Sequence, residues 1–246
     1  MINAMKISIS ISTNEDYIHY TQTFINSVKR HNPEFDIYLT SVDCTPDIPG
    51  VCVKTIKLDA PVSRKYLKDF SPDFFKYNNT DITKGYKNLL YSESMFASCY
   101  ARYAAIPYLM DKYDYVITAD VDMLLRAPIS NLIGDYDFRT HFFVDSGNVV
   151  ICEENLQITK STDAMKRFWL RFNEEYDKIE VGHGKWNVGS DIFYKLLNGE
   201  FSDIRLINLK LGIEDESLDE NAVVWSGDCL KKNHELFKKE MSKYIL

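Results

Sequence analysis

The hydrophobic pattern at the start of the chain predicts a β–α unit followed by two further strands. In residues 6–13, KISISIST, apolar and polar positions alternate with period two, which is typical of a β-strand. Residues 17–30 place apolar side chains near helical spacing and predict a helix. Residues 36–42 and 51–58 predict two more strands, separated by a turn that contains Pro and Gly.

A strong helix is predicted over residues 92–113, where Ala and Met are good helix formers and Pro107 can introduce a kink. The apolar run YVITA at 115–119 predicts a buried strand. Further strands are expected at 139–152 and 203–209, and further helices at 160–177, 187–197 and 231–244. Because strands and helices alternate, the pattern predicts an α/β fold with a doubly wound, mainly parallel central sheet and helices on both faces.

The domain organisation is read as one domain over residues 1–246, because no repeat, low-complexity tract or linker interrupts the pattern. Residues 59–90 are irregular, aromatic and rich in lysine. This stretch is too long for a plain connection, so it is a candidate functional loop that shapes a lid or an acceptor site.

Composition and charge narrow the class of protein. The chain is 45% hydrophobic and 26% charged, as in soluble globular proteins. Its net charge of −7 and its dispersed basic residues argue against nucleic-acid binding. No apolar run is long enough to cross a bilayer, and the N-terminus lacks the apolar block of a signal peptide. The five cysteines form no CxxC pair, so we expect reduced, mostly buried thiols and a cytoplasmic location.

Two acidic residues, Asp120 and Asp122, directly follow the apolar run at 115–119. Ligands of an open α/β sheet bind beyond the carboxyl ends of its strands, where a turn lets both carboxylates face one cation. Mg²⁺ and Mn²⁺ prefer oxygen ligands and commonly bridge phosphate oxygens. The pair therefore suggests a site for a metal and a diphosphate, and the alternative is a surface turn with two solvated acids.

Residues 101–129, ARYAAIPYLMDKYDYVITADVDMLLRAPI, resemble the core signature of nucleotide-sugar glycosyltransferases with the GT-A fold. The resemblance is to glycogenin-like and bacterial lipopolysaccharide galactosyltransferase-like enzymes. It implies a single Rossmann-like GT-A domain, with a nucleotide-binding half at 1–125 and a sugar and acceptor half at 126–246. It also implies a metal-dependent transfer of a sugar from a nucleotide-sugar donor, UDP-sugar favoured, to a carbohydrate or glycolipid acceptor.

Other segments extend the resemblance and supply candidate donor-binding residues. STNEDY at 12–17 resembles the loop that grips the nucleotide base, which points to Asn14, Asp16 and Tyr17. VDSGNVVI at 144–151 resembles the strand that lines the sugar site, which points to Ser146 and Gly147, although Asp145 replaces the usual Asn.

NVGSDIFYKLLNG at 187–199 resembles the helix start beside the reacting carbon, but only Asp191 matches, so the stereochemical outcome stays open. VVWSGDCLKK at 223–232 resembles the closing H-x-x-G-x-x-K segment. Val224 stands at the position of the metal-binding His. Asp228 is then the candidate replacement ligand, and Lys231 the candidate lysine for the diphosphate.

The resemblance assigns Asp120 and Asp122 to Mn²⁺ or Mg²⁺, with Asp120 also near the ribose. Arg102 is a candidate for the sugar or the diphosphate, and its alternative is a salt bridge on a helix surface. Asp191 is a candidate base or anchor for the acceptor hydroxyl, or an acid favoured by a helix dipole. Asn14 and Asp16 could instead cap the helix at 17–30.

Two other classes of function compete with a transferase. The sequence DVDML also resembles the motif of haloacid-dehalogenase-like phosphatases, in which Asp120 would be the nucleophile and Asp122 the acid or base. That motif normally lies on the first strand, whereas at least three strands are predicted before it here. The second class is a non-catalytic sugar-nucleotide-binding protein of the same fold.

Overall fold

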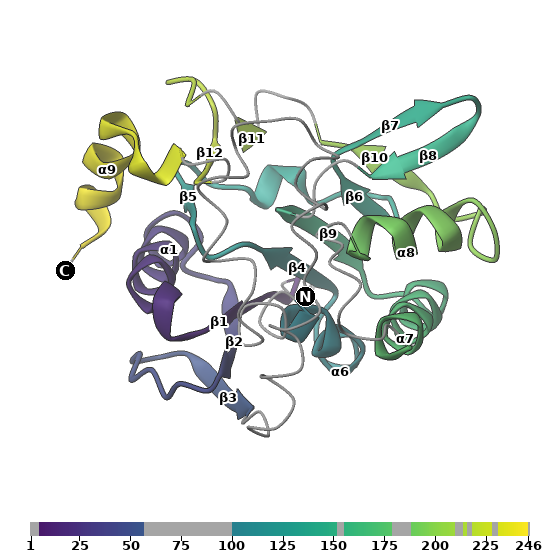
Figure 1. Cartoon of the computed structure of the whole chain (residues 1–246), viewed down its shortest axis with the longest axis horizontal. Helices are drawn as coiled ribbons and strands as arrows, with labels where there is room; N and C mark the ends of the chain where they lie inside the picture. The colour runs from purple at the N-terminus through teal and green to yellow at the C-terminus, as the bar shows by residue number, and fades with distance from the viewer. Residues whose placement is uncertain are drawn as a thin grey trace, which may run out of the picture.

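The computed structural model describes residues 5–56, 100–151, 155–178, 188–209, 214–215, 218–227 and 231–245. Its centre is a seven-stranded sheet with the strand order β10-β6-β9-β4-β1-β2-β3 (Figure 1). The strands are β1 (Ile7–Thr13), β2 (Asp36–Val42), β3 (Cys52–Ile56), β4 (Tyr115–Ala119), β6 (Phe138–Thr140), β9 (Leu156–Lys160) and β10 (Leu206–Asn208).

Six of these strands run in one direction, and β9 is antiparallel to both of its neighbours. The expectation of a mainly parallel sheet is therefore confirmed. The pattern did not predict β9: its first four residues lie between the strand expected at 139–152 and the helix expected at 160–177, and its last residue, Lys160, was assigned to that helix. A strand this short offers little periodicity to detect, although Leu156 and Ile158 are fully buried.

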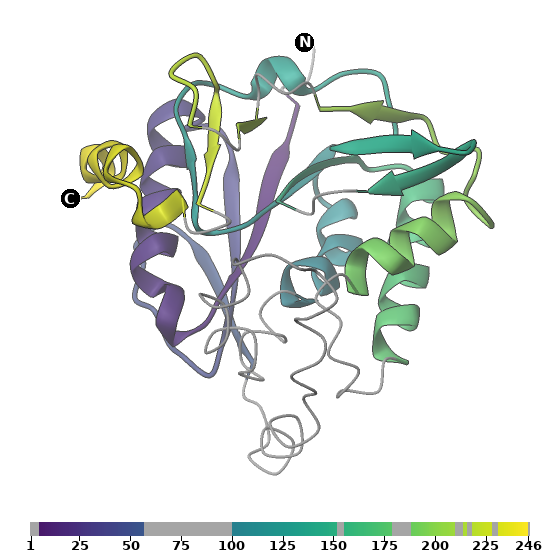
Figure 2. The same cartoon turned by 45° about the horizontal axis from the view of Figure 1, so that its top comes forward.

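Helices cover both faces of the sheet, as expected (Figure 2). On one face lies α1 (Ile18–His31), which follows a 3₁₀ turn, η1 (Glu15–Tyr17). On the other lie α6 (Ile106–Met110), α7 (Asp163–Asp177) and α8 (Val188–Leu197).

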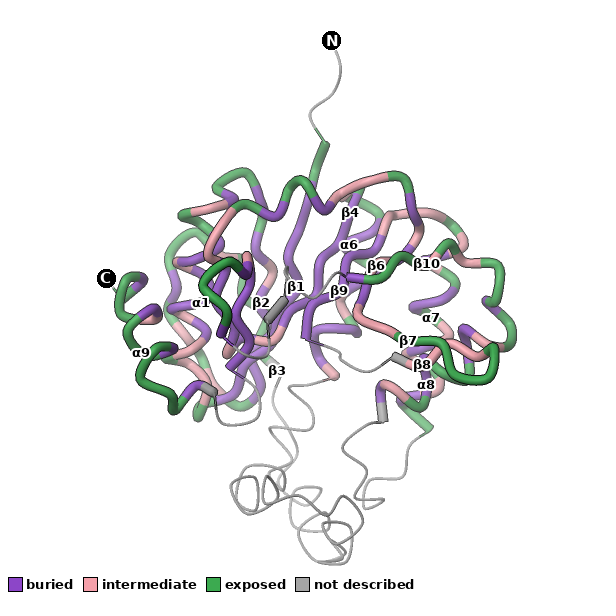
Figure 3. Tube along the Cα trace, turned by 90° about the horizontal axis from the view of Figure 1, so that it is seen from above, coloured by how far each residue is buried: buried purple, intermediate pink, exposed green. Residues whose placement is uncertain are grey.

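The strand before the two aspartates is buried on both sides, as Figure 3 shows for the central strands. Tyr115, Ile117 and Ala119 pack in the hydrophobic cluster that includes α1, whereas Val116 packs in the cluster that includes α7 and α8. Because side chains alternate along a strand, β4 contributes to both layers and is held firmly in place.

A smaller three-stranded sheet lies beside the central one. It consists of β11 (Glu214–Asp215), β12 (Val224–Ser226) and β5 (Met123–Leu125), with β12 between the other two. β5 directly follows the two aspartates and pairs antiparallel with β12. A hairpin, β7 (Phe142–Asp145) and β8 (Asn148–Ile151), projects from the side of the molecule opposite α1 (Figure 1). Other short elements are η2 (Ser130–Leu132), η3 (Lys231–Asn233), α9 (Glu235–Met241) and η4 (Ser242–Tyr244).

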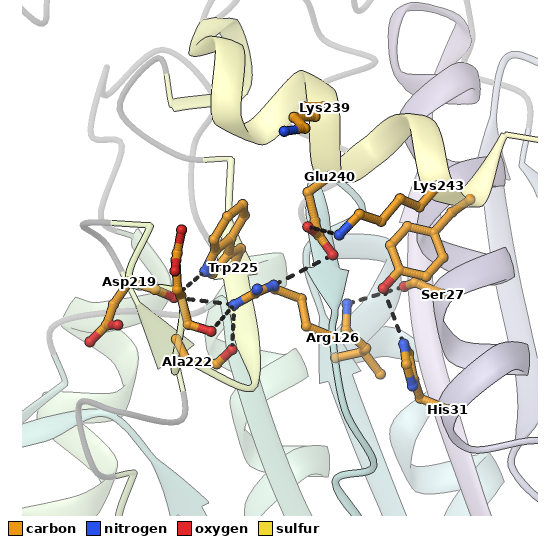
Figure 4. A network of polar contacts seen from close by, with 12 residues as sticks. Ser27, His31, Arg126, Asp219, Ala222, Trp225, Lys239, Glu240 and Lys243 are labelled. Carbon is orange, nitrogen blue, oxygen red and sulfur yellow. Dashed lines mark hydrogen bonds and ion pairs between the residues drawn. The ribbon is translucent and has the colours of Figure 1, made fainter.

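Polar contacts hold the C-terminal helices against β5 and α1 (Figure 4). Arg126, which follows β5, donates to the backbone carbonyls of Asp219, Glu220 and Ala222 at 3.2, 2.9 and 3.0 Å. Its Nε lies 3.6 Å from Oε1 of Glu240 on α9, and its guanidinium lies 4.0 Å from the ring centroid of Trp225. Trp225 is buried. This arrangement links β5, β12 and the C-terminal helix.

Several predicted elements differ in extent from the observed ones. Within the helix predicted at 92–113, residues 100–104 are helical, Ala105 interrupts the helix, and Pro107 lies in the first turn of α6, where its missing N–H costs little. The helix predicted at 231–244 is divided into η3, α9 and η4. The strand predicted at 203–209 is limited to β10. The loop predicted at 59–90 lies outside the described residues.

Two further observations bear on the composition. Of the cysteines in the described ranges, Cys44 is half-buried and Cys52 is exposed, and both are free thiols. The expectation of mostly buried cysteines therefore does not hold for these two. None of the helices in the described ranges has the length and apolar character needed to span a bilayer.

Candidate active site

Asp120 and Asp122 occupy the turn between β4 and β5, at the carboxyl end of β4. β4 and β1 are parallel, with Ser10 opposite Thr118, so the end of β1 and the loop at residues 14–17 lie at the same edge of the sheet. This is the edge at which open α/β sheets bind ligands. The position expected for the two carboxylates is therefore the position observed.

The Asp120 carboxylate forms an ion pair with the guanidinium of Arg102. Arg102 is 5% exposed, so the alternative of a salt bridge on a helix surface does not describe it. Its Nη2 also donates to the hydroxyl of Tyr103 at 3.0 Å, and Ser10 Oγ donates to its backbone carbonyl at 2.8 Å. Arg102 is thereby fixed against β1, and it holds the orientation of Asp120.

The Asp122 carboxylate is paired with Lys232, which the pattern did not select. Lys232 Nζ lies 2.7 Å from Oδ2 of Asp122, and the two side chains are only 9% and 13% exposed. Nζ also donates to the hydroxyl of Tyr17 at 2.9 Å. Burial alone lowers the pKa of Lys232, but the charge of Asp122 and the contact with Tyr17 outweigh it, so the pKa is raised and the lysine is charged.

Lys232 thus brings two predicted site residues, Tyr17 and Asp122, together. The lysine expected from the motif was Lys231, one residue earlier, whose side chain lies outside the described part of the structure. The sequence contained a weak signal for Lys232, because two lysines follow one another at 231–232, and Lys231 stays a candidate for the diphosphate.

Gly227 is joined to both Asp122 and Lys232 by backbone hydrogen bonds. Its amide donates to the carbonyl oxygen of Asp122 at 2.7 Å, which extends the pairing of β12 with β5 by one residue. A Cβ at this position would lie 2.3 Å from the same oxygen, so a side chain cannot be accommodated without a backbone shift. The amide of Lys232 in turn donates to the carbonyl of Gly227 at 3.2 Å, which returns the lysine to the aspartate.

The loop at residues 14–17 reaches the same edge, and its role as a helix cap is not supported. Asn14 is buried, at 2% exposure, and its side chain makes no capping hydrogen bond. Its backbone carbonyl accepts from the amide of Tyr17 at 3.1 Å. Asp16 is exposed in η1, and α1 begins after Tyr17 without a side-chain cap.

Ser146 and Gly147 lie elsewhere. They form the exposed turn of the β7–β8 hairpin, with φ angles of 50° and 83°. Two adjacent residues with positive φ are typical of the tight turn that joins two antiparallel strands. The structure therefore gives these residues a local conformational role, and it does not bring them to the turn that carries Asp120 and Asp122.

Asp191 is exposed in the first turn of α8. Asn198, at the other end of this helix, bonds to the backbone amide and carbonyl of Val149 at 2.7 and 2.8 Å, so α8 and the hairpin are fixed to each other. In Figures 1 and 2, α8 begins near the middle of the molecule and runs outward, so its first turn is the end nearer to β4.

The described residues supply only part of a metal-binding site. Asp120 and Asp122 supply hard carboxylate oxygens, which suit Mg²⁺ or Mn²⁺ in kind. Val224 is fully buried in the hydrophobic core and offers no ligand atom. Asp228 lies outside the described residues. Within the described ranges, no group of three or more His, Cys, Asp or Glu side chains is arranged to hold a metal.

Comparison with known proteins agrees with this architecture. The family model described as "Glycosyl transferase family 8" matches residues 8–190. A search of curated proteins found no match. The galactosyltransferase LgtC, crystallised with donor and acceptor sugar analogs, is similar over 97% of this chain and 96% of its own, with 13% identity and a TM-score of 0.52.

Two further solved structures share the fold over part of their length. The glycosyltransferase GlyE of Streptococcus pneumoniae is similar over 98% of this chain and 60% of its own, with 16% identity and a TM-score of 0.52. The bifunctional glycosyltransferase WbbM is similar over 99% and 52%, with 14% identity and a TM-score of 0.51. At these identities the likeness shows the fold, which is the GT-A fold expected from the sequence.

Proposed function

Because this chain belongs to glycosyl transferase family 8 and is a glycosyltransferase, we propose that it transfers a sugar from a nucleotide-diphosphate sugar to a carbohydrate or lipid-linked acceptor. A UDP-sugar is the favoured donor. The observation that carries this proposal is the meeting of Tyr17, Asp122 and Lys232 beside the Arg102–Asp120 pair at the carboxyl edge of β4. The similar fold of LgtC, crystallised with donor and acceptor sugar analogs, supports a two-substrate reaction.

Charge at this edge supports a divalent cation as cofactor. The formal charges of Asp120, Asp122, Arg102 and Lys232 cancel, so these four side chains offer a diphosphate no net positive charge. We place Mn²⁺ or Mg²⁺ at Asp120 and Asp122, with Asp228 as the proposed third protein ligand. Mg²⁺ is commonly held by one or two carboxylates together with substrate phosphates and water, which fits a site with few protein ligands.

The remaining residues divide between the donor and the acceptor. When bound, the cation acts as a Lewis acid on the diphosphate leaving group. Arg102 keeps Asp120 oriented, Tyr17 and Asn14 line the nucleotide side of the edge, and Lys232 or Lys231 adds positive charge for the diphosphate. Asp191 is proposed to accept a proton or a hydrogen bond from the acceptor hydroxyl.

The division of the chain into a nucleotide-binding half at 1–125 and a sugar and acceptor half at 126–246 remains part of the proposal. Lys232 qualifies it, because this residue from the second half contacts Tyr17 and Asp122 of the first. Ser146 and Gly147 stay candidates for the sugar side only if the donor reaches the hairpin.

The phosphatase alternative gains no support. The motif DVDML follows β4, which is preceded by β1, β2 and β3 among the described residues and lies inside the sheet beside β1. The family match and the similar structures are glycosyltransferases. Membership of an enzyme family also argues against the alternative of a non-catalytic sugar-nucleotide-binding protein.

The deciding experiment is calorimetric titration of UDP and of GDP, each with and without Mn²⁺, into the intact protein and into Asp122→Asn. We expect UDP to bind in the presence of Mn²⁺ and this binding to be lost in Asp122→Asn. Asp111→Asn is the matched control, because Asp111 is an exposed acid that pairs with Lys166 on the surface.

Absence of binding of either nucleotide under every condition would overturn the proposed function. Release of phosphate from a phosphomonoester, dependent on Asp120, would replace it with the phosphatase. Release of sugar from a bound UDP-sugar, measured in a following hydrolysis assay, would support the transferase chemistry over binding alone.

A further inference from the structure

The Asp122 carboxylate already has a cationic partner inside the protein. Lys232 Nζ lies 2.7 Å from Oδ2, and at 9% exposure the lysine is nearly as buried as the surrounding core. A surface lysine could move away into water at little cost, but this ammonium is enclosed by protein on most sides. The Asp122–Lys232 ion pair is therefore held in place by the surrounding fold.

Simultaneous binding of the Lys232 ammonium and a divalent cation to the Asp122 carboxylate is energetically unfavourable. Two like charges within a few ångströms repel strongly where water is excluded, and a doubly charged ion doubles that repulsion. A buried ammonium that loses its carboxylate partner is also costly unless another anion receives it. The site therefore has two alternative states: in one, Asp122 pairs with Lys232, and in the other, Asp122 binds a divalent cation.

We propose that Lys232 competes with the divalent cation for Asp122, so that the cation binds tightly only when the donor's diphosphate receives the displaced ammonium. The inference rests on the proposed function, since it concerns the same donor site. Its consequence is that metal and nucleotide bind cooperatively, because each removes an obstacle to the other. Such a coupling is reciprocal by thermodynamic necessity.

The surroundings of Lys232 keep the displaced ammonium near the site. Its Nζ donates to the Tyr17 hydroxyl at 2.9 Å and lies 4.7 Å from the centroid of the Tyr17 ring and 5.6 Å from that of Tyr20. Aromatic faces attract cations, so these rings stabilise the ammonium beside Asp122 as well as on it. The backbone of Lys232 is held by its hydrogen bond to Gly227, which leaves the side chain as the moving part.

The test measures Mn²⁺ binding to the intact chain without nucleotide, by the electron paramagnetic resonance signal of free Mn²⁺. Three proteins are compared: wild type, Lys232→Met and Lys238→Met. Lys238→Met is the matched control, because it removes an equal charge from an exposed position where the lysine pairs with Glu235. We expect Lys232→Met to bind Mn²⁺ about tenfold more tightly than the other two, within the range typical of coupled sites.

The same titrations are then repeated with saturating UDP. We expect UDP to raise Mn²⁺ affinity in all three proteins, because its phosphates add ligands, but to raise it least in Lys232→Met. Tyr17→Phe is a second variant for the case in which Lys232→Met does not fold. It weakens the hold on the ammonium without leaving Asp122 unpaired, and we expect a smaller gain in Mn²⁺ affinity.

Equal Mn²⁺ affinities of wild type and the foldable variants without nucleotide would overturn the competition and leave the proposed function standing. UDP binding that is equally tight in EDTA and in Mn²⁺ would also overturn it, since Lys232 would then replace the cation. No Mn²⁺ binding by any of the proteins, with or without UDP, would overturn the proposed metal site and the competition with it.

Discussion

The amide of Gly227 donates a hydrogen bond of 2.7 Å to the carbonyl oxygen of Asp122, and no side chain fits between them. This contact connects two segments that are far apart in the sequence, the turn after β4 and the segment after β12. It fixes the backbone of one aspartate and the start of the segment that delivers Lys232. The site therefore depends on a glycine that carries no chemistry of its own.

Gly227→Ala tests this dependence. The added Cβ would lie 2.3 Å from the Asp122 carbonyl and 3.2 Å from the Lys232 Cβ, so the backbones must separate. We expect a loss of about 1–3 kcal/mol in the free energy of unfolding, as for other overpacked positions, together with weaker nucleotide binding. Urea denaturation and UDP titration measure the two effects.

Gly134→Ala is the control for Gly227→Ala. A Cβ at Gly134 meets the Tyr136 ring at 3.5 Å, an ordinary contact, so little change is expected in either measurement. Equal effects of the two substitutions would show that the close approach at Asp122 has no special importance.

The sequence was sufficient for the parts of the fold that have a long or regular pattern. Residues 36–42 were predicted as a strand with the observed bounds, and β1 differs from its prediction by one residue. The strands β5 and β12, with three residues each, have too few positions to show a period, and they were missed. They nevertheless form the pairing that carries Gly227 to Asp122.

The sequence likewise predicted some residues of the candidate site and missed others. The Asp120–Asp122 pair was found because two acids after a buried strand need a partner, and Arg102 was found by resemblance. Lys232 was missed because it lies 110 residues away from Asp122 along the chain. No local pattern reports a contact of that range, and the motif pointed to the adjacent Lys231.

Removing one member of the Asp122–Lys232 pair should destabilise the protein more than removing both. Asp122→Asn leaves a buried ammonium without its carboxylate, which typically costs about 3–5 kcal/mol. We expect Asp122→Asn combined with Lys232→Met to recover part of that loss, because neither charge remains buried. Chemical denaturation of the single and double variants in EDTA measures the difference.

An exposed pair serves as the comparison for this cycle. Asp111 and Lys166 form an ion pair on the surface, with side chains that are 59% and 36% exposed. Its removal should change the stability by less than about 1 kcal/mol. A similar small value for the Asp122 single variant would contradict the view that its pair is buried.

Acid should weaken the link between α7 and α8. Hydrogen bonds from Lys195 and then Lys178 lower the pKa of Glu175 to about 2. Because the folded pKa lies below the ordinary value of 4.5, the stabilisation is present above pH 4.5 and disappears as the pH falls toward 2. The two lysines are 60% and 59% exposed, so solvent screening limits the effect to about 1 kcal/mol.

Glu175→Gln tests this link, since glutamine keeps the shape and removes the charge. The melting temperature of the variant should be lower than that of wild type at pH 7, and the gap should close as the pH is lowered from 4.5. Glu200→Gln is the control, because its contact with Arg171 is longer, at 3.5 Å. A gap for Glu175→Gln that stays constant down to pH 3 would show that its charge is not the cause.

Arg126 should stabilise the C-terminal helix through the backbone as well as through charge. Its Nη1 donates to three carbonyls, and its Nε is paired with Glu240, so a methionine removes all of these contacts (Figure 4). Lysine restores a charge but lacks the planar group that reaches several acceptors at once. We therefore expect Arg126→Met to destabilise the fold by about 2–4 kcal/mol and Arg126→Lys to recover less than half of that loss.

Hydrogen exchange should show the largest loss of protection in residues 218–226 and in α9. Full recovery by lysine would mean that the charge, rather than the three carbonyl contacts, holds β12 in place beside β5, and hence Gly227 against Asp122.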